Sequence, residues 1–155
     1  NDTTRHLINR DTLTKMRPEA TIINASRGGV VDNSAVAESG HRYLFDVWEE
    51  EPNIYPEVLQ RATIATPHIA GYSKQGKANA SAMSVRAVAS LYNFPLTSWY
   101  PSDTKPTTPQ PISWEELCRT IDQYCDIVAE SERLKASPLE FEDMRNNYNY
   151  RDEYF

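Results

Sequence analysis

The first part of the chain contains three short, predominantly apolar runs that are rich in β-branched and aromatic residues. These runs are Thr21–Ala25, Tyr43–Val47 and Thr63–Thr66. Because polar positions do not alternate regularly with apolar ones in them, we interpret the runs as buried strands of a parallel sheet. The predicted fold class is therefore α/β.

Helices are predicted around these strands. A helical turn is expected over Asp11–Met16, and a second helix over Asn33–Ser39, with Asp32 as its N-cap and Gly40 at its end. The connection between the second and third strands is expected to be a loop, and a long helix without proline follows over Ser73–Tyr92. Three strands are too few for a complete doubly wound sheet, so we predict a partial doubly wound, Rossmann-like sheet.

The C-terminal part has the clearest helical periodicity in the sequence. Seven apolar residues recur with i, i+3, i+4, i+7 spacing, which predicts one amphipathic helix over residues 114–128. They are Trp114, Leu117, Cys118, Ile121, Tyr124, Cys125 and Val128. This apolar face requires cover, either by a partner subunit or by the sheet domain of the same chain.

Serine residues mark the starts of two helices in this part. Ser113 with Glu116 forms a capping box at the start of the first. Ser137 and Pro138 repeat the signal for a second helix. The second helix would carry Phe141, Met144 and Tyr148.

Proline divides the chain. Five prolines fall within residues 94–112, which cannot form a regular helix or a central strand and are expected to be an extended linker. We predict a sheet domain with its long return helix over residues 1–93. Residues 113–155 are predicted to form a small, partly helical, acidic dimerisation domain, so that a homodimer is expected.

Charge and composition exclude several classes of partner. The formal net charge is −6, and the acidic excess lies in residues 101–155, which makes nucleic acid an unexpected partner. No apolar run is long enough to span a bilayer, and no secretion signal opens the chain. The seven-residue spacing of Cys118 and Cys125 suits a helix face better than a disulfide or a metal site, which favours a reducing cytoplasm.

Three polar residues stand just beyond the three predicted strands: Arg27, Glu51 and His68. In an open α/β sheet the ligand binds outside the carboxyl ends of the strands, so these side chains are expected to converge there. A guanidinium, a carboxylate and an imidazole could hold an anionic substrate and move a proton. Each has a plain alternative: a surface arginine, the last residue of a solvated acidic run, and a core histidine.

Three segments resemble, in order, the signatures of the D-2-hydroxyacid dehydrogenases. They are Ile23–Asp32, Asp46–Pro52 and Thr66–Gly71. Within that family, Tyr72, Gly76-Lys77 and the tail segment Phe141–Tyr148 most resemble the branch that oxidises 4-phosphoerythronate in vitamin B6 biosynthesis. Residues 1–93 would then correspond to the C-terminal half of an NAD-binding domain.

The resemblance implies roles for individual residues. His68 would be the acid/base that takes the proton of the substrate hydroxyl, Glu51 would hold its imidazole, and Arg27 would bind the substrate carboxylate. Tyr72 would touch the phosphorylated 2-hydroxy acid substrate. The cofactor would be NAD, lined by Ala25, Ser26, Arg27, Asp46 and Gly71. For Asp46 the alternative is an aspartate that caps a neighbouring loop, and for Tyr72 it is packing at a helix start.

Two departures from the family pattern bear on these expectations. The sequence has no G-x-G-x-x-G turn, so the chain alone is expected to bind NAD poorly and to be inactive. The segment from Val30 to Tyr43 is shorter than the family pattern. Two other functions stay open: another D-2-hydroxyacid dehydrogenase, such as a phosphoglycerate type, and a non-catalytic dimerisation module.

Overall fold

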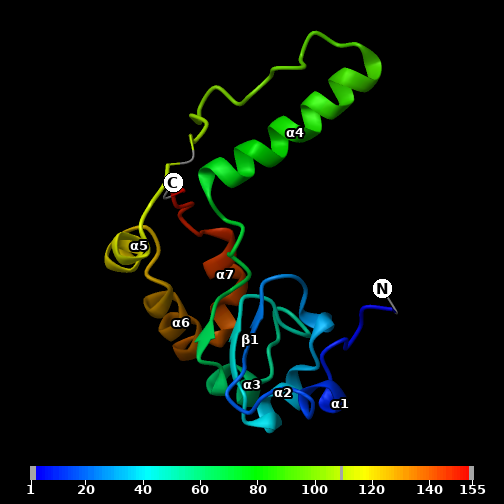
Figure 1. Ribbon diagram of the computed structural model, residues 1–155, viewed down its shortest axis with the longest axis vertical. Coiled ribbons are helices and arrows are strands. Elements are labelled where there is room, and N and C mark those ends of the chain that lie inside the picture. Colours follow the sequence, from blue (N-terminus) through cyan, green and yellow to red (C-terminus); the bar gives the residue numbers. More distant parts are fainter. Residues whose placement is uncertain (1–2, 109, 154–155) are drawn as a thin grey trace. The chain divides into compact units, whose positions relative to one another are not determined.

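The computed structural model describes residues 3–108 and 110–153 (Figure 1). The contacts divide the chain into two compact units, one formed by residues 1–70 and 127–148, the other by residues 71–126 and 149–155. The elements of the first unit are α1 (Arg10–Leu13), β1 (Thr21–Asn24), η1 (Gly28–Val30), α2 (Asn33–Ser39), β2 (Arg42–Phe45), α3 (Pro56–Arg61), β3 (Ile64–Ala65), α6 (Ile127–Ala136), η3 (Pro138–Glu140) and α7 (Phe141–Asn146). Those of the second are α4 (Lys74–Tyr92), α5 (Trp114–Thr120) and η2 (Ile121–Gln123).

The three predicted strands form one parallel sheet in the order β1-β2-β3. This confirms the predicted α/β class and places the carboxyl ends of all three strands at one edge. β1 is not buried on both faces, however: Ile22 is 8% exposed, whereas Ile23 is 72% exposed. Residues of β1 are thus alternately exposed and buried, so one face of this strand is covered and the other is not.

The helices around the sheet follow the sequence signals in part. α2 has the predicted bounds, with the Asp32 side chain accepting a hydrogen bond from the N–H of Ala35 and Gly40 in a left-handed conformation at its end. α1 is shorter than predicted and is capped by Asn9. The expected loop between β2 and β3 is wrong, because α3 lies there with a proline at its first position.

The C-terminal helices complete the core of the first unit (Figure 1). On α6, Ser131 is 1% exposed and its hydroxyl accepts a hydrogen bond from the N–H of Ala65 at 3.0 Å, which satisfies a backbone donor of the outer strand β3. Leu134, Phe141 and Met144 belong to the same apolar cluster as Tyr43 of β2. The chain's own sheet therefore covers the second predicted tail helix.

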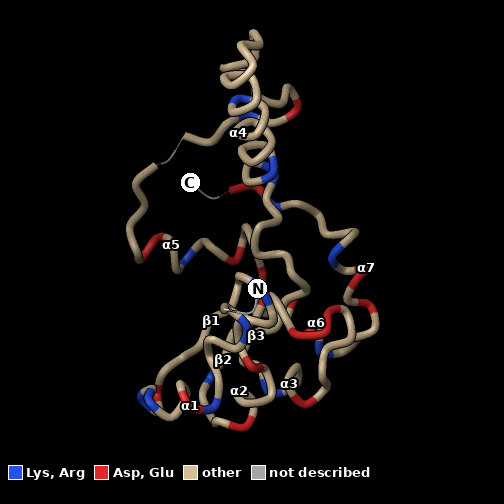
Figure 2. Tube along the Cα trace, turned by 90° about the vertical axis from the view of Figure 1, so that its right-hand side faces the viewer, with Lys and Arg blue, Asp and Glu red and all other residues tan. Residues whose placement is uncertain are grey.

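The single amphipathic helix predicted over residues 114–128 is wrong. The segment breaks into α5 and η2, and α6 begins only at Ile127. Ser113 caps α5 as predicted, accepting a hydrogen bond from the N–H of Glu116 at 3.1 Å. Ser137 precedes η3 but makes no capping hydrogen bond through its side chain. The acidic residues of the tail are spread over α5, α6 and α7 (Figure 2).

The second unit is organised around α4, which has 19 residues and agrees with the predicted helix over Ser73–Tyr92, with Ser73 as its N-cap. Its buried apolar side chains are small: Ala78, Ala82 and Ala89. The chain returns to the start of α4, where the N–H of Lys74 donates to the carbonyl of Arg151 at 2.9 Å. The predicted linker contains no helix or strand in its described residues, 94–108 and 110–112. α6 and α7 group with the first unit, whereas α5 groups with the second. The division into a linker and a dimerisation domain remains a prediction.

Candidate active site

The structure brings Glu51 and His68 together. Nδ1 of His68 lies 2.8 Å from Oε2 of Glu51, and the other carboxylate oxygen accepts a hydrogen bond from the N–H of Trp48 at 2.7 Å. The two side chains are 25% and 20% exposed, so the pair lies at the surface of the unit without being fully solvated. Within the described residues, Nε2 of His68 has no hydrogen bond or ion pair. The Glu51 carboxylate thus orients the imidazole of His68. Nε2 of the imidazole is then available to accept a proton from a ligand.

The backbone of His68 adopts a left-handed conformation, with φ of 59°. For a residue other than glycine this costs of the order of 1–3 kcal/mol, so the surrounding contacts must hold it. Asp46, at the end of β2, provides them. Its carboxylate accepts hydrogen bonds from the Thr66 hydroxyl at 2.7 Å and from the N–H groups of Ile69 and Ala70 at 2.7 and 3.1 Å.

These contacts are those of an aspartate that caps a neighbouring loop. The side chain is buried, at 7% exposure, and its two oxygens are engaged on either side of His68. A role of Asp46 in cofactor binding remains a prediction. What the geometry gives directly is a structural role: Asp46 fixes the loop that presents the imidazole.

Arg27 lies in the turn that follows β1. Its guanidinium is exposed and donates to the carbonyl of Ser26 at 2.6 Å, and among the described residues it contacts neither Glu51 nor His68. Convergence of all three side chains remains a prediction. The turn after β1 nevertheless packs against the turn after β2 that leads to Glu51, since a Cβ on Gly28 would lie only 1.9 Å from the carbonyl oxygen of Trp48. Only glycine permits that approach.

The remaining predicted ligand-binding residues fall in both units. Ala25 and Ser26 are exposed in the first unit, at the carboxyl end of β1. Gly71 and Tyr72 belong to the second. There the Tyr72 ring packs edge-on against Tyr150, with ring centroids 5.4 Å apart, and Nζ of Lys77 lies 4.0 Å from the centre of the Tyr72 ring. Their roles toward cofactor and substrate remain predictions.

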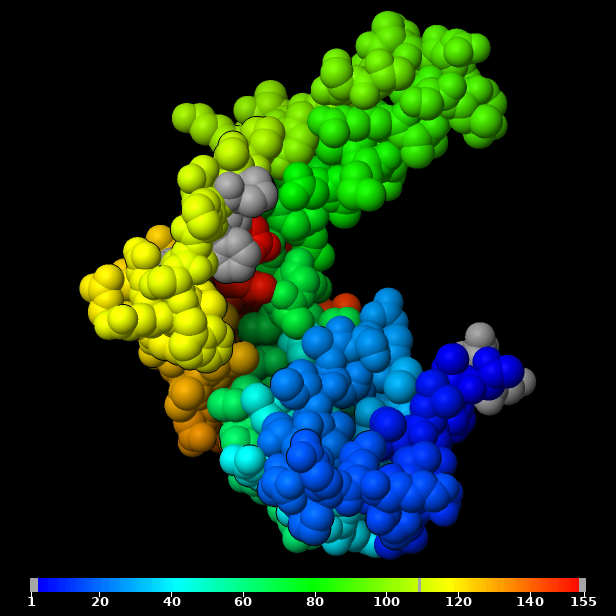
Figure 3. Space-filling model, viewed as in Figure 1, coloured from blue at the N-terminus to red at the C-terminus, as the bar shows by residue number. Residues whose placement is uncertain are grey.

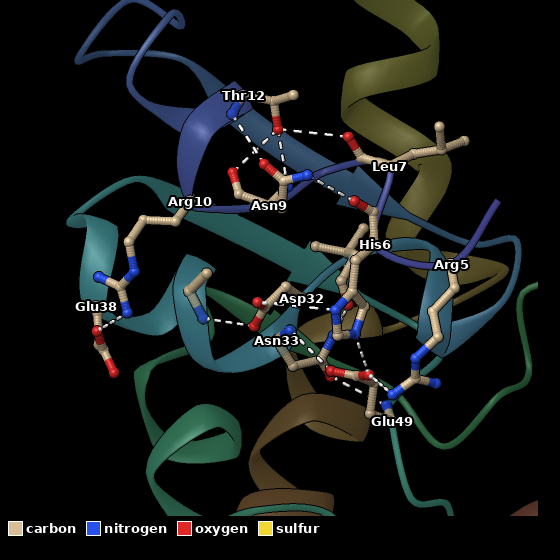
Figure 4. Close-up of polar contacts among 12 residues, drawn as sticks. Arg5, His6, Leu7, Asn9, Arg10, Thr12, Asp32, Asn33, Glu38 and Glu49 are labelled. Carbon is tan, nitrogen blue, oxygen red and sulfur yellow. Dashed lines mark hydrogen bonds and ion pairs between the residues drawn. The ribbon is translucent and has the colours of Figure 1, made fainter. Parts of the chain in front are cut away.

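Sequence reasoning missed two residues that shape this edge of the sheet. Asn24 is 3% exposed; its side chain accepts from the N–H of Ser26 and donates to the carbonyl of Arg27, which sets the turn after β1. Glu49 is drawn into a network with the N-terminal segment (Figure 4). An asparagine inside an apolar strand was the available signal for Asn24. Nothing in the sequence distinguished Glu49 from the neighbouring glutamates.

In the described part of the chain, no group of three or more His, Cys, Asp or Glu side chains is arranged to hold a metal ion. None of the described helices is long and apolar enough to cross a membrane.

Comparison with protein families identifies the class to which this site belongs. Residues 1–70 match the family described as D-isomer specific 2-hydroxyacid dehydrogenase, NAD binding domain. The matched part of the chain contains Arg27, Glu51 and His68.

Similarity to particular relatives extends over nearly the whole chain. The chain is 33% identical to an erythronate-4-phosphate dehydrogenase of Bacteroides thetaiotaomicron over 155 residues, which covers 97% of this chain and 44% of the relative. It is also 33% identical to the enzyme of that name from Coxiella burnetii, over 97% of this chain and 43% of the relative. The chain thus spans less than half the length of these relatives.

Solved structures agree with the fold. A glyoxylate reductase from Paecilomyes thermophila aligns with a TM-score of 0.50 and 25% identity over 68% of this chain and 34% of its own. A D-lactate dehydrogenase from Aquifex aeolicus, crystallised with NAD and lactic acid, aligns with a TM-score of 0.50 and 25% identity over 61% of this chain and 35% of its own.

Proposed function

We propose that this chain supplies the C-terminal part of an NAD-dependent dehydrogenase that oxidises 4-phospho-D-erythronate to 3-hydroxy-2-oxo-4-phosphooxybutanoate in vitamin B6 biosynthesis. The observation that carries the proposal is the Glu51–His68 hydrogen bond of 2.8 Å, with Nε2 of the imidazole directed to no partner within the described residues. Similarity to the erythronate-4-phosphate dehydrogenases supports the choice of substrate.

The chemistry assigned to the chain's own residues is proton transfer and anion binding. Oxidation of an alcohol to a ketone requires that its hydroxyl proton be removed as the hydride leaves the same carbon. Nε2 of His68 accepts that proton, and the Glu51 carboxylate stabilises the imidazolium that results. Arg27 binds the substrate carboxylate through two parallel N–H groups, after its guanidinium leaves the carbonyl of Ser26.

NAD, when bound, would accept the hydride. Ala25, Ser26 and Arg27 are exposed at the carboxyl end of β1, where a doubly wound sheet binds its ligand, so these residues fit one part of a dinucleotide site. The sequence contains no G-x-G-x-x-G turn, so the chain offers no phosphate cradle of that kind. We therefore expect the isolated chain to bind NAD weakly and to lack activity.

We also propose that residues 113–155 contribute to a homodimer. Trp114, Tyr124 and Val128, three of the apolar positions predicted for this segment, are 78%, 41% and 57% exposed. Residues 113–126, drawn in yellow, form part of the visible surface in Figure 3. A second copy would bury this apolar surface. We further expect a cytoplasmic location, in keeping with two free cysteines.

A chimeric enzyme tests the catalytic proposal. The chain would be joined to the residues that precede the matched region in the Bacteroides thetaiotaomicron relative, and NAD reduction would be followed with 4-phosphoerythronate and with 3-phosphoglycerate. We expect turnover of the first acid. His68→Ala should lower kcat by roughly 10²- to 10⁴-fold, the range of general acid–base catalysis.

Each alternative predicts a different result from the same chimera. Preferential turnover of 3-phosphoglycerate would favour a phosphoglycerate type of dehydrogenase. A folded chimera that reduces NAD with neither acid would favour the non-catalytic module. Full activity of the His68→Ala variant would remove His68 from the chemistry.

A further inference from the structure

Three consecutive glutamates, Glu49, Glu50 and Glu51, occupy the turn after β2. We infer that Glu49 is a positioning residue. It ties this turn to the turn after β1 that carries Arg27, called here the arginine-bearing turn, and thereby holds Glu51 against His68. Only the effect of Glu49 on catalysis rests on the proposed function. The contacts that carry the inference are independent of any substrate.

The Glu49 carboxylate is engaged on both oxygens (Figure 4). Oε1 lies 2.6 Å from Nε2 of His6, and a guanidinium nitrogen of Arg5 lies 3.5 Å from the same oxygen. Oε2 accepts a hydrogen bond from the N–H of Asn33 at 3.0 Å. The Glu49 side chain is only 11% exposed, compared with 63% for Arg5, so the contacts to His6 and Asn33 are the better shielded from water.

The pairing with Asn33 runs in both directions. The N–H of Glu49 donates to Oδ1 of Asn33 at 3.1 Å, while the Asn33 amide nitrogen donates to the carbonyl of Val31 at 2.8 Å. Asn33 is 1% exposed. Removing the Glu49 carboxylate would therefore leave the N–H of the buried Asn33 without its acceptor. This costs about 1–3 kcal/mol when no water replaces the carboxylate.

The residues that Glu49 holds lie on both sides of the arginine-bearing turn. The N–H of His6 donates to the carbonyl of Gly29 at 2.8 Å, and Asn33 follows directly after the turn at the start of α2. Glu49 therefore links the segment paired with Gly29 to the residue that begins α2. Gly28, in the arginine-bearing turn, also packs on Trp48, which precedes the acidic turn formed by Glu49, Glu50 and Glu51. The two turns are therefore held against each other.

The geometry of the acidic turn separates the three glutamates. Glu50 has φ of 59°, is exposed, and makes no side-chain hydrogen bond or ion pair within the described residues. On one side of it Glu49 binds His6 and Asn33; on the other, Glu51 binds His68. A shift of the Glu49 anchor would reach Glu51 through only two peptide units. Glu50 is thus a matched control for the same charge in the same turn.

Nitrogen NMR of the 155-residue chain tests the inference without requiring turnover. The chain has three histidines, so the ring nitrogens of His6 and His68 can be assigned by substituting each in turn. In Glu51→Gln the Nδ1 signal of His68 should shift, because its carboxylate partner is lost. Glu49→Ala should shift the same His68 signal in the same direction, and should also shift the ring signals of His6. Glu50→Ala should leave both histidines unchanged.

A folded Glu49→Ala chain whose His68 signals match those of the unsubstituted chain would overturn the inference. If Glu49→Ala fails to fold, His6→Ala serves as the second variant, since it removes the ring that contacts Oε1 of Glu49 and keeps the Asn33 contact. It should produce a smaller shift of the same sign at His68. Unchanged His68 signals in His6→Ala would then overturn the inference.

Kinetics of the chimera distinguish positioning from a general loss of stability. Because misplacing a catalytic group by about 1 Å can cost roughly 10²-fold in rate, Glu49→Ala should lower kcat by about 10- to 100-fold, while KM for NAD changes less than about twofold. Glu50→Ala should keep kcat unchanged. Equal kcat in the Glu49→Ala and unsubstituted chimeras would overturn the catalytic consequence. An inactive chimera would count against the proposed function alone, because the NMR result stands without it.

Discussion

The two compact units of the chain treat their apolar side chains in opposite ways. In the first, Tyr43, Phe45 and Phe141 are 2%, 1% and 1% exposed. In the second, Met83, Leu91 and Trp114 are 70%, 72% and 78% exposed, and the buried apolar side chains of α4 are alanines. The first unit thus has a core of large apolar side chains, completed by the returning helices α6 and α7, although Ile23 and Leu139 remain exposed. The second presents apolar surface that its own chain does not cover.

The same difference appears among the predicted site residues. In the first unit, Glu51 is hydrogen-bonded to His68, and Asp46 is hydrogen-bonded to the loop around His68. These hydrogen bonds are 2.7–3.1 Å long. Gly71, in the second unit, is exposed, and in the described part of the chain a Cβ there would meet no heavy atom within 4 Å beyond its chain neighbours. The Glu51–His68 pair is therefore assembled within this chain, whereas close contact with Gly71 would have to come from a ligand or another part of the protein.

The largest expected effect is at Phe141, which closes the core of the first unit. Phe141→Ala should lower the free energy of unfolding by about 3–5 kcal/mol, because it removes a buried ring and leaves a cavity. Urea unfolding followed by circular dichroism measures this. Leu139, two residues earlier, is 100% exposed and provides the control. If Leu139→Ala were as destabilising as Phe141→Ala, α7 would not pack on the sheet as described.

Gly28 offers the next test, at the contact between the two turns. Gly28→Ala would place a Cβ 1.9 Å from the Trp48 carbonyl oxygen and 2.6 Å from the N of Glu49. The backbone must move to accommodate it, which should cost about 3 kcal/mol, the upper part of the range for overpacking. A Cβ on the neighbouring Gly29 would come no closer than 3.7 Å to any group, so Gly29→Ala is the matched control. Equal unfolding midpoints in urea for the two variants would contradict the packing of these turns.

Much of the first unit could be predicted from the sequence. The strands, and α2 with its caps at Asp32 and Gly40, carry local signals that the tertiary structure did not override. α3 was missed because six residues are too few to display a helical period. The break after α5 was missed for the opposite reason: the apolar spacing continues across it, although the backbone does not remain helical. The burial of Phe141 depends on contacts distant in sequence and could not be read from periodicity.

The candidate site was predictable only at the level of residue types at strand ends. The resemblance of Asp46–Pro52 to a family signature singled out Glu51 among three glutamates, because the family pattern has its glutamate next to the proline. The structure places the Glu51 carboxylate 2.8 Å from the imidazole of His68. The contacts of Asp46 with the loop around His68 could not be deduced, because an aspartate at a strand end suits a cap and a ligand equally. The anchoring of Glu49 by His6 spans 43 residues and is a tertiary property.

Tyr43 gives an intermediate, pH-dependent test of the first unit. Burial raises the pKa of its phenol to about 12, and the hydroxyl donates to the carbonyl of Val58 at 2.5 Å. Above the ordinary pKa of about 10 the unfolded chain ionises this group before the folded chain does, so stability is retained below about pH 10 and lost as the pH rises toward 12. The loss should total about 2 kcal/mol. Tyr43→Phe should cost about 1 kcal/mol at neutral pH and remove this part of the alkaline loss. Identical alkaline profiles for the two chains would contradict the buried phenol.

The smallest effect is expected in the second unit, at Trp114. Because its side chain is 78% exposed, Trp114→Ser should change the free energy of unfolding by less than about 0.5 kcal/mol in dilute solution, where the chain is alone. The same substitution should weaken self-association at higher concentration if a second copy covers this surface. Urea unfolding at low concentration and sedimentation at high concentration measure the two effects separately. A loss above about 1 kcal/mol at low concentration would mean that Trp114 packs within its own chain, and the contrast between the two units would fail at that residue.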